Sequence, residues 1–251
     1  MVALQELVQY ADGLLRAGEF VDYCPNGLQV EGRSEVRRLI AGVTASQALV
    51  DAAALTGADA LLVHHGYFWK GESHPVTGIK RRRLGALLQA QMSLLAYHLP
   101  LDAHPELGNN AQLGMRLRID MAGRCGPPPL ELVAHGRLSE PLTPAGMAAR
   151  IEQAVGRVPL HVGEGPEHIR TVGWCTGAAQ GFIEHAVAAG LDAYISGEIS
   201  EQTVHIAREA GIHYFAAGHH ATERGGADAL GRHLAERFGL EYRFIDIDNP
   251  V

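Results

Sequence analysis

The fold is decided by residues 39–65, which read LIAGVTASQALVDAAALTGADALLVHH. Two apolar runs, Leu39–Thr44 and Ala60–His64, enclose a segment of helical character over Ser46–Thr56. Both apolar runs are nearly continuous, which is typical of strands covered on both faces of a sheet. The stretch therefore predicts a strand, helix and strand unit of an α/β domain with a largely parallel sheet.

The same alternation continues in both directions along the chain. Apolar residues at helical spacing predict an amphipathic helix over residues 4–15. Further predicted elements are a helix over Lys80–Met92, a strand over Leu94–His98, a strand over Leu130–His135, a helix over Thr143–Val155, strands around Val158, Thr171 and Tyr194, a helix over Thr222–Phe238 and a last strand over Tyr242–Ile247. The alternation predicts two related α/β domains with largely parallel or mixed sheets.

A proline triplet at Pro127–Pro129, directly after Gly126, interrupts this pattern. Proline cannot continue a helix or donate to a strand ladder, so we expect a domain boundary there. The first α/β domain is then residues 1–125 plus 220–251, and the second is 126–219. We expect the functional site in the cleft between them.

A weak internal repeat links the two halves. Gly57-Ala58-Asp59-Ala60 and Gly190-Leu191-Asp192-Ala193 each precede an apolar strand that ends in polar residues. One interpretation is two related α/β units; the other is a similarity that any two such units would share. In α/β sheets, ligands bind beyond the carboxyl ends of the strands.

Composition limits the classes of function. The chain has 251 residues, of which 47% are hydrophobic and 20% charged, as in a globular protein. A net charge of −7 provides no general attraction for nucleic acid or anionic membranes. No apolar run approaches the ~20 residues of a membrane span, and the first residues lack a basic leader, so we predict a cytoplasmic protein. The three cysteines form no CxxC pair, which argues against a thiolate zinc site, whereas the 14 histidines are unusual.

The first histidine motif closes the strand described above. His64 and His65 end the apolar run and are followed by Gly66. At a strand end that opens into a glycine loop, both side chains can turn to one crevice. They are either ligands, one for each of two metal ions, or a hydrogen-bonded structural pair.

A second motif follows the next strand. His98 and Asp102 are four residues apart, and Pro100 between them predicts an irregular loop instead of a helix face. Taken alone, Asp102 would more often be a solvated loop acid.

A third motif lies near the end of the chain. His219 and Glu223 are also four residues apart, and we expect His219 to end a strand and Thr222 to begin a helix. Imidazole and carboxylate from strand ends suit a borderline divalent metal. Taken alone, this segment would more often be structural.

The three motifs together make the stronger case. Five ligands exceed the three that a catalytic zinc typically takes from the protein, and suit two metal ions ~3.5–4 Å apart. The candidate ligands are His64, His65, Asp102, His219 and Glu223, with His98, His104 and His220 as further candidates.

Four segments carry a resemblance to a known family. They are HHGYFWKGE (64–72), HLPLDAHPELGNNAQL (98–113), SGEISEQTVH (196–205) and AGHHATERGG (217–226). These segments resemble the NIF-three-like family, whose bacterial members are called GTP cyclohydrolase I type 2 homologs. The resemblance covers essentially the whole chain.

The resemblance implies a dinuclear metal site between a pair of α/β domains. Its ligands would be the five residues above, with Glu223 as the bridge. It also implies a ring-shaped homohexamer whose metal sites face the interior. Many relatives carry an inserted domain in mid-chain, for which this sequence has no room.

Several residues near these motifs have either a functional or a structural interpretation. Glu198 and Glu201 follow the second apolar strand and would carry protons, or else are acids that stabilise a helix start. Tyr67, Trp69 and Lys70 would hold an aromatic, anionic ligand, although such aromatics more often pack on neighbours. The basic run Lys80–Arg83 is expected to be a solvated helix face, with phosphate binding as the alternative.

Two hypotheses for function follow. In the first, the chain is a metal-dependent hydrolase in which His98, Glu198 or His220 moves the proton, acting on a nucleotide or related ring. For a GTP cyclohydrolase the attacked atom would be C8 of guanine, although no P-loop pattern is present. In the second, it is a non-catalytic metal-binding assembly or regulatory interaction protein.

The expected cofactor is two divalent ions per chain. Nitrogen and oxygen ligands without thiolate admit zinc, iron or manganese. The expected partners are a small-molecule substrate and copies of the same chain, with no membrane and no nucleic acid.

Overall fold

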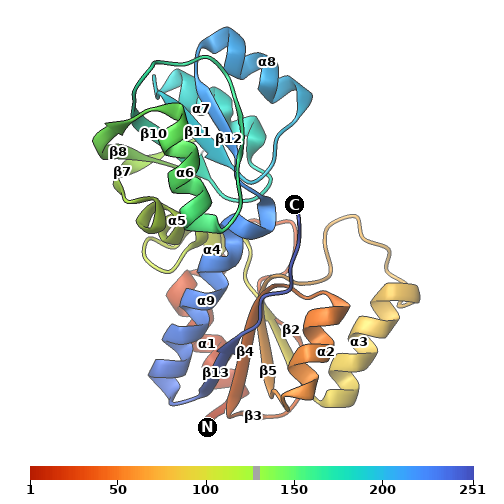
Figure 1. Ribbon diagram of the computed structural model, residues 1–251. Coiled ribbons are helices and arrows are strands. Elements are labelled where there is room, and N and C mark those ends of the chain that lie inside the picture. Colours follow the sequence, from red (N-terminus) through yellow and green to blue (C-terminus); the bar gives the residue numbers. More distant parts are fainter. Residues whose placement is uncertain (127–130) are drawn as a thin grey trace. The chain divides into compact units, whose positions relative to one another are not determined.

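The structure, a computed structural model, describes residues 1–126 and 131–251 (Figure 1). The chain forms two compact units: unit 1 is residues 1–108 and 226–248, and unit 2 is residues 109–225 and 249–251. Each unit contains its own mixed sheet with helices, so the predicted α/β class is confirmed. Within the described ranges, no helix combines the length and apolar character needed to span a membrane.

Unit 1 is built on a five-stranded sheet. The strand order is β13 (Glu241–Phe244), β4 (Arg38–Thr44), β5 (Ala60–His65), β6 (Ser93–Ala96), β2 (Gly27–Val30). The first four strands are parallel and β2 is antiparallel to β6, while a short ladder joins β1 (Val2–Ala3) to β3 (Glu35–Val36). All four parallel strands therefore end at the same edge of the sheet.

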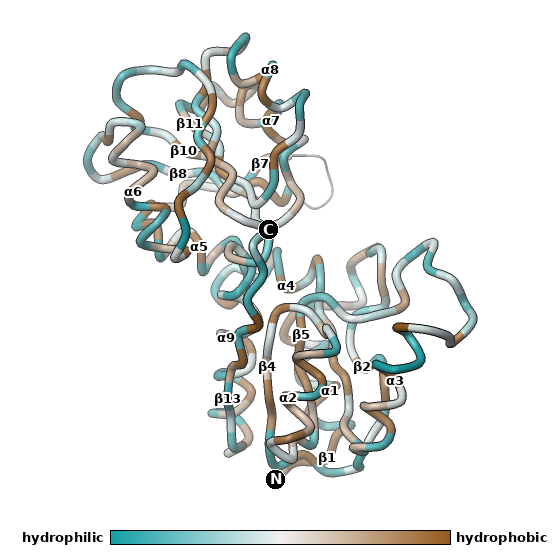
Figure 2. The backbone as a smooth tube through the Cα atoms, turned by 45° about the vertical axis from the view of Figure 1, so that its right-hand side comes forward, coloured by the Kyte–Doolittle hydropathy of each residue, from teal (hydrophilic) through white to brown (hydrophobic). Residues whose placement is uncertain are grey.

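Helices bury both faces of this sheet. Leu39, Leu62 and Tyr97 pack in one core cluster with apolar residues of α1 (Leu4–Leu15) and the second half of α9 (His219–Phe238). Leu61 and Val63 pack in another cluster with α2 (Gln47–Leu55) and α3 (Gly78–Ala90). Because alternate residues of β5 face opposite clusters, its nearly continuous apolar sequence is explained (Figure 2).

Unit 2 contains a six-stranded sheet. The order is β7 (Ile119–Cys125), β8 (Val133–Leu142), β10 (Ile169–Cys175), β11 (Ala193–Ser196), β12 (His213–Ala216), β9 (Leu160–Val162). Strand β10 pairs parallel with β11 and β11 with β12, whereas the pairs β7–β8, β8–β10 and β12–β9 are antiparallel. Its helices are α5 (Asn109–Leu117), α6 (Pro144–Val155), α7 (Ile183–Ala188), α8 (Glu201–Ala210) and the first turns of α9, with short 3₁₀ turns at Gln180–Phe182 here and Ala17–Glu19 in unit 1.

The internal repeat has a structural counterpart in two aspartates. Asp59 Oδ2 accepts hydrogen bonds from the backbone N–H groups of Arg37 and Arg38, each 2.9 Å long, where β4 begins. Asp192 Oδ2 accepts from the N–H groups of Arg170 and Thr171, each 2.8 Å long, where β10 begins. The same device at equivalent positions supports the interpretation of two related units.

The predicted domain boundary at Gly126 is wrong. Strand β7 pairs with β8 in the unit 2 sheet, so residues 109–125 belong to unit 2 instead of the first domain. The proline triplet lies outside the described residues, and β7 and β8, which precede and follow it in sequence, pair with each other. The second boundary falls within α9, between Gly225 and Gly226.

Two local predictions also need correction. Helix α4 (Leu99–Ala103) occupies the expected loop, because Pro100 lies in its first turn, where proline is tolerated. Helix α9 begins at His219, three residues before the predicted start, and β12 ends at Ala216.

Candidate metal centre

Three histidines gather at the carboxyl edge of the unit 1 sheet. His64 and His65 end β5, and His98 is the N-cap of α4, just after β6. Each offers a ring nitrogen within 4.8 Å of the others, and the His64 ring centroid lies 4.5 Å from that of His65 and 5.1 Å from that of His98. Adjacent parallel strands thus bring residues that are distant in sequence into one cluster.

The backbone orients the buried imidazole of His64. Its Nδ1 lies 2.9 Å from the carbonyl oxygen of Tyr97. Because a carbonyl only accepts, Nδ1 carries the proton and Nε2 presents its lone pair. His65 Nδ1 similarly lies 3.1 Å from Thr44 Oγ1. Hydrogen bonding of the second ring nitrogen is the usual arrangement for metal-ligating histidine.

Asp102 adds a carboxylate to this cluster. It is buried, with 8% of its surface exposed, and its Oδ1 lies 3.5 Å from His64 Nε2. The alternative of a solvated loop acid is therefore excluded. Since α4 begins directly after His98, the short helix places Asp102 beside the strand-end histidines.

Asp22 orients His98, and sequence reasoning missed it. Its Oδ1 lies 2.7 Å from His98 Nδ1, while Oδ2 accepts from Asn26 Nδ2 and Leu99 N, each at 2.9 Å. Burial raises the pKa of Asp22, but hydrogen bonds from His98, Asn26 and Leu99 and the charge of His98 outweigh it, giving a pKa of about 2. Its ionised carboxylate therefore holds His98 with Nε2 presented.

Cys24 lies in the same neighbourhood but is a poor ligand. Its Sγ groups with Asp22 and His98 within 4.8 Å. Burial, and then the charge of Asp22, raises the pKa of this thiol to about 12, so it stays protonated near neutral pH. The cluster therefore offers mainly nitrogen and oxygen.

Unit 2 contains a second group of ligand-type residues, in the first turns of α9. His219 and Glu223 share a helix face, and His219 Nε2 lies 3.2 Å from Glu223 Oε2. Glu223 is almost fully buried, with 3% of its surface exposed. His219 Nδ1 lies 2.7 Å from Glu198 Oε1, so this imidazole too is held through Nδ1. Burial lowers the pKa of His219, but hydrogen bonds and charges from Glu223 and Glu198 outweigh it and raise the pKa to about 9.

Glycine makes room for this pair. Gly177 adopts a positive φ of +69°, and a Cβ at this position would clash with Glu223 Oε1 and lie 3.2 Å from His219 Nε2. The backbone of residue 177 therefore approaches the side chains of His219 and Glu223 as only glycine can.

Other predicted residues have different surroundings. His104 Nδ1 accepts the N–H groups of Glu106 and Leu107, which gives it a turn-stabilising contact. His220 is half-buried and directly follows His219, and its backbone N–H donates to the carbonyl oxygen of Val251. Exposed Glu201 is the first residue of α8, as the helix-start alternative expects.

Of the predicted aromatic residues, Trp69 lies against the unit 1 histidines. Its ring centroid is 5.9 Å from that of His65 and 5.0 Å from that of His98. Tyr67 is buried and donates its hydroxyl to the carbonyl of Ala45, whereas Lys70 is exposed. Of the three predicted residues, Trp69 is therefore the one whose side chain borders the candidate metal centre.

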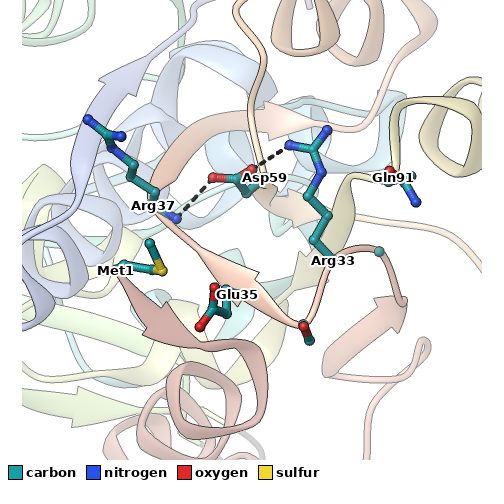
Figure 3. A pocket seen from close by; sticks show the side chains of 8 residues that line it. Met1, Arg33, Glu35, Arg37, Asp59 and Gln91 are labelled. Atoms are coloured by element: carbon teal, nitrogen blue, oxygen red, sulfur yellow. Dashed lines mark hydrogen bonds and ion pairs between the residues drawn. The ribbon is translucent and has the colours of Figure 1, made fainter.

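A separate open cavity lies at the opposite, amino end of the unit 1 sheet. It measures about 720 Å³ and is lined by Arg33, Arg37 and Asp59, among others (Figure 3). Arg33 pairs with Asp59 at 2.7 Å, and Arg37 pairs with Glu241 at 3.1 Å. Both arginines of this cavity are thus paired with carboxylates. No histidine is among the residues that line it.

The residues present fit divalent metal ions. Imidazoles held through Nδ1, together with buried carboxylates, form a nitrogen and oxygen donor set suited to zinc, iron or manganese. The fold and these donors define a two-unit α/β protein with a histidine- and carboxylate-rich candidate metal centre.

Comparison with known proteins identifies the family of this chain. The model of the family "Duf34/NIF3 (NGG1p interacting factor 3)" matches residues 2–250, so the chain belongs to the DUF34/NIF3 family. Relatives called "GTP cyclohydrolase 1 type 2 homolog" are 58% identical over 251 residues in Pseudomonas aeruginosa, covering 100% of this chain and 99% of the relative, and 53% identical over 247 residues in Escherichia coli, covering 98% of each.

Solved structures share the fold over their whole length. The protein ybgI, described as of unknown function, has a TM-score of 0.96 at 52% identity, and a protein from Thermus thermophilus has a TM-score of 0.91 at 35% identity. Each comparison covers 100% of both chains. The family resemblance expected from the four motifs is confirmed.

Proposed function

We propose that the chain is a dinuclear metal-dependent hydrolase. The proposed ligands are His64, His65 and Asp102 from unit 1 with His219 and Glu223 from unit 2, Glu223 bridging two divalent ions. The observation that carries the proposal is the shared way in which His64 and His219 are held: in both units Nδ1 meets an acceptor and Nε2 adjoins a buried carboxylate. Hydrogen bonding of the ring nitrogen remote from the metal is the usual arrangement of a metal-ligating histidine.

The chemistry assigned to the centre is hydrolysis. Two bound divalent ions would lower the pKa of a water molecule and polarise the bond to be broken. His98, whose Nδ1 contacts Asp22, would accept or return a proton at Nε2. Glu198 accepts from His219 Nδ1, which favours an orienting role over the proton-carrying role predicted for it. His220 is an alternative proton carrier.

The substrate class is proposed from the relatives' printed name, which points to a nucleotide or a related ring. We further propose a cytoplasmic homohexamer, which the family resemblance implies. The alternative function is a non-catalytic metal-binding assembly or regulatory interaction protein, favoured by the family description as an interacting factor.

Turnover separates the two functions. Purified metal-loaded protein is assayed against GTP, other nucleotides and simple phosphoesters, alongside Glu223→Ala and a control, Glu209→Ala, that changes an exposed residue of α8. We expect hydrolysis that a chelator and Glu223→Ala abolish and Glu209→Ala leaves intact. A metal-loaded protein without turnover on any of these compounds would favour the non-catalytic alternative.

A further inference from the structure

A second pocket of unit 1 lies between the loop after β5 and the start of α3. It measures about 320 Å³, within the range of about 300–1,000 Å³ typical of small-molecule sites. Tyr67, Pro75 and Ile79 provide apolar wall. The polar lining residues are Glu72, Ser73, Thr77, Lys80 and Arg83. Helix α3 carries four consecutive cations near its start, Lys80–Arg83, and this stretch of the tube is hydrophilic in Figure 2.

The charges of this pocket do not cancel. Lys80 Nζ lies 3.2 Å from Glu72 Oε1 and donates to the carbonyl of Ser73 at 2.9 Å, so Lys80 is compensated. Arg83 has no ion-pair partner among residues 1–126 and 131–251, and its buried Nε has no hydrogen-bond partner there. Burying a guanidinium without a counter-charge costs free energy, and a bound anion would offset that cost.

Arg83 differs in this respect from its neighbours. Arg81 and Arg82 are exposed, whereas Arg83 is half-buried and lines the pocket. Burial raises the pKa of Tyr67 to about 12, and the positive charge of Arg83 opposes this rise, so the guanidinium acts on the pocket's inner wall. The predicted solvated helix face therefore holds for Arg81 and Arg82, whereas Lys80 and Arg83 are half-buried and line the pocket.

The available groups match a phosphate. The planar fork of arginine binds phosphate oxygens through two parallel hydrogen bonds. The Thr77 side chain makes no cap hydrogen bond to α3, which leaves its hydroxyl able to donate to the same ligand. A pocket of this volume has room for an organic group beside the phosphate.

One loop connects the pocket with the unit 1 histidines. Glu72 pairs with Lys80 through Oε1 and accepts the backbone N–H of Trp69 through Oε2 at 3.1 Å. The Trp69 ring in turn lies against His65 and His98. We propose that this pocket binds the phosphate group of an organic substrate on which the metal centre acts, an assignment that rests on the proposed function.

Calorimetric titration of the full chain tests the pocket, with metal removed so that phosphate cannot bind metal. The probes are ribose 5-phosphate, inorganic phosphate and ribose. We expect ribose 5-phosphate to bind more tightly than inorganic phosphate, and ribose not to bind. Arg83→Gln should weaken ribose 5-phosphate binding at least tenfold, Arg83→Lys less, and the exposed control Arg82→Gln not at all.

The proposal is overturned if wild type binds no phosphate compound, if Arg83→Gln binds as wild type does, or if Arg82→Gln loses as much affinity. Equal affinity for inorganic phosphate and ribose 5-phosphate would overturn the assignment to an organic substrate. Melting curves of each variant exclude unfolding as the cause. Metal content, measured on separate untreated samples, tests the proposed function, so failure of that function and failure of the phosphate pocket give different results.

Discussion

Glu198 Oε1 lies 2.7 Å from His219 Nδ1, and this contact fixes which nitrogen of His219 faces the buried carboxylate of Glu223. A carboxylate behind an imidazole also raises its basicity. The pair therefore makes Glu198 a positioning residue of the candidate centre.

Removing this contact should weaken metal binding. For Glu198→Gln we expect about 10- to 100-fold lower metal affinity with little change in thermal stability, the range typical of partners behind a ligand. Competition with a chromogenic chelator measures the affinity. Glu201→Gln, which changes an exposed residue of α8, is the control. Equal losses in both variants would argue against the positioning role.

Metal binding should release a proton from His219. In the metal-free protein its pKa is about 9, so it is protonated at about pH 7.5 and must lose that proton to become a ligand. Because the folded pKa lies above the unfolded value of 6.5, the proton stabilises the metal-free fold fully below pH 6.5, and this contribution is lost as pH rises through about 9.

Calorimetry in two buffers of different ionisation enthalpy measures this proton. We expect about one more proton released near pH ~7.5 in wild type than in His219→Gln. Identical proton release from the two proteins would contradict the assignment of His219 as a ligand.

Gly177→Ala should disturb the candidate centre more than the fold. The strain of a positive φ costs about 1–2 kcal/mol for alanine, and the new Cβ would also displace Glu223. Gly190→Ala is a matched control, because its φ is +65° and no atom lies within 4 Å of the added Cβ. We expect similar stability losses by chemical denaturation, with metal loss confined to Gly177→Ala. Full metal retention in that variant would count against the placement of Glu223.

Asp22 should contribute acid-dependent stability. Its folded pKa of about 2 lies below the usual value of 3.8, so its contribution is present above pH 3.8 and is lost as pH falls through about 2. Asp22→Asn should lower the free energy of unfolding by about 2 kcal/mol at neutral pH, and the difference should shrink as the pH approaches the folded pKa. Urea titrations of both proteins across this range provide the comparison. A difference that does not vary with pH would remove the ionised Asp22 from the explanation.

The paired aspartates should support each sheet by the same mechanism. Asp59→Ala and Asp192→Ala each leave two backbone N–H groups without their acceptor, which should cost about 1–3 kcal/mol. Asp120→Ala, at an exposed position, is the control and should change little. Denaturant unfolding measures all three. An unaffected Asp192→Ala would contradict the equivalence of the two units.

Much of unit 1 was predictable because its signals are local. The apolar runs of residues 39–44 and 60–64 predict the strands β4 and β5. The histidine pair at the end of the second run marks the carboxyl edge of the sheet. The start of α9 was misplaced because Thr222 looks like an N-cap. In the structure its hydroxyl donates to the carbonyl of His219 and accepts from the N–H of Gly177, and the latter contact is tertiary.

Asp22 could not be predicted for the same physical reason. It lies 76 residues from His98 in sequence, within a turn-rich stretch that carries no ligand spacing of its own. Only the folded loop brings the two together. The boundary at 108/109 could not be predicted, because a proline triplet ends a helix or strand pattern without indicating whether a domain ends there.

Metal content per chain shows whether the residues of both units hold metal ions. Elemental mass spectrometry is applied to untagged wild type, His64→Ala, Glu223→Ala and the control His168→Ala, which changes an exposed residue. We predict about two metal ions per wild-type chain, the same in His168→Ala, and a clear drop in each of the other two variants. Wild type that takes up no zinc, manganese or ferrous iron, or His64→Ala and Glu223→Ala variants that retain full metal, would contradict the proposed metal centre.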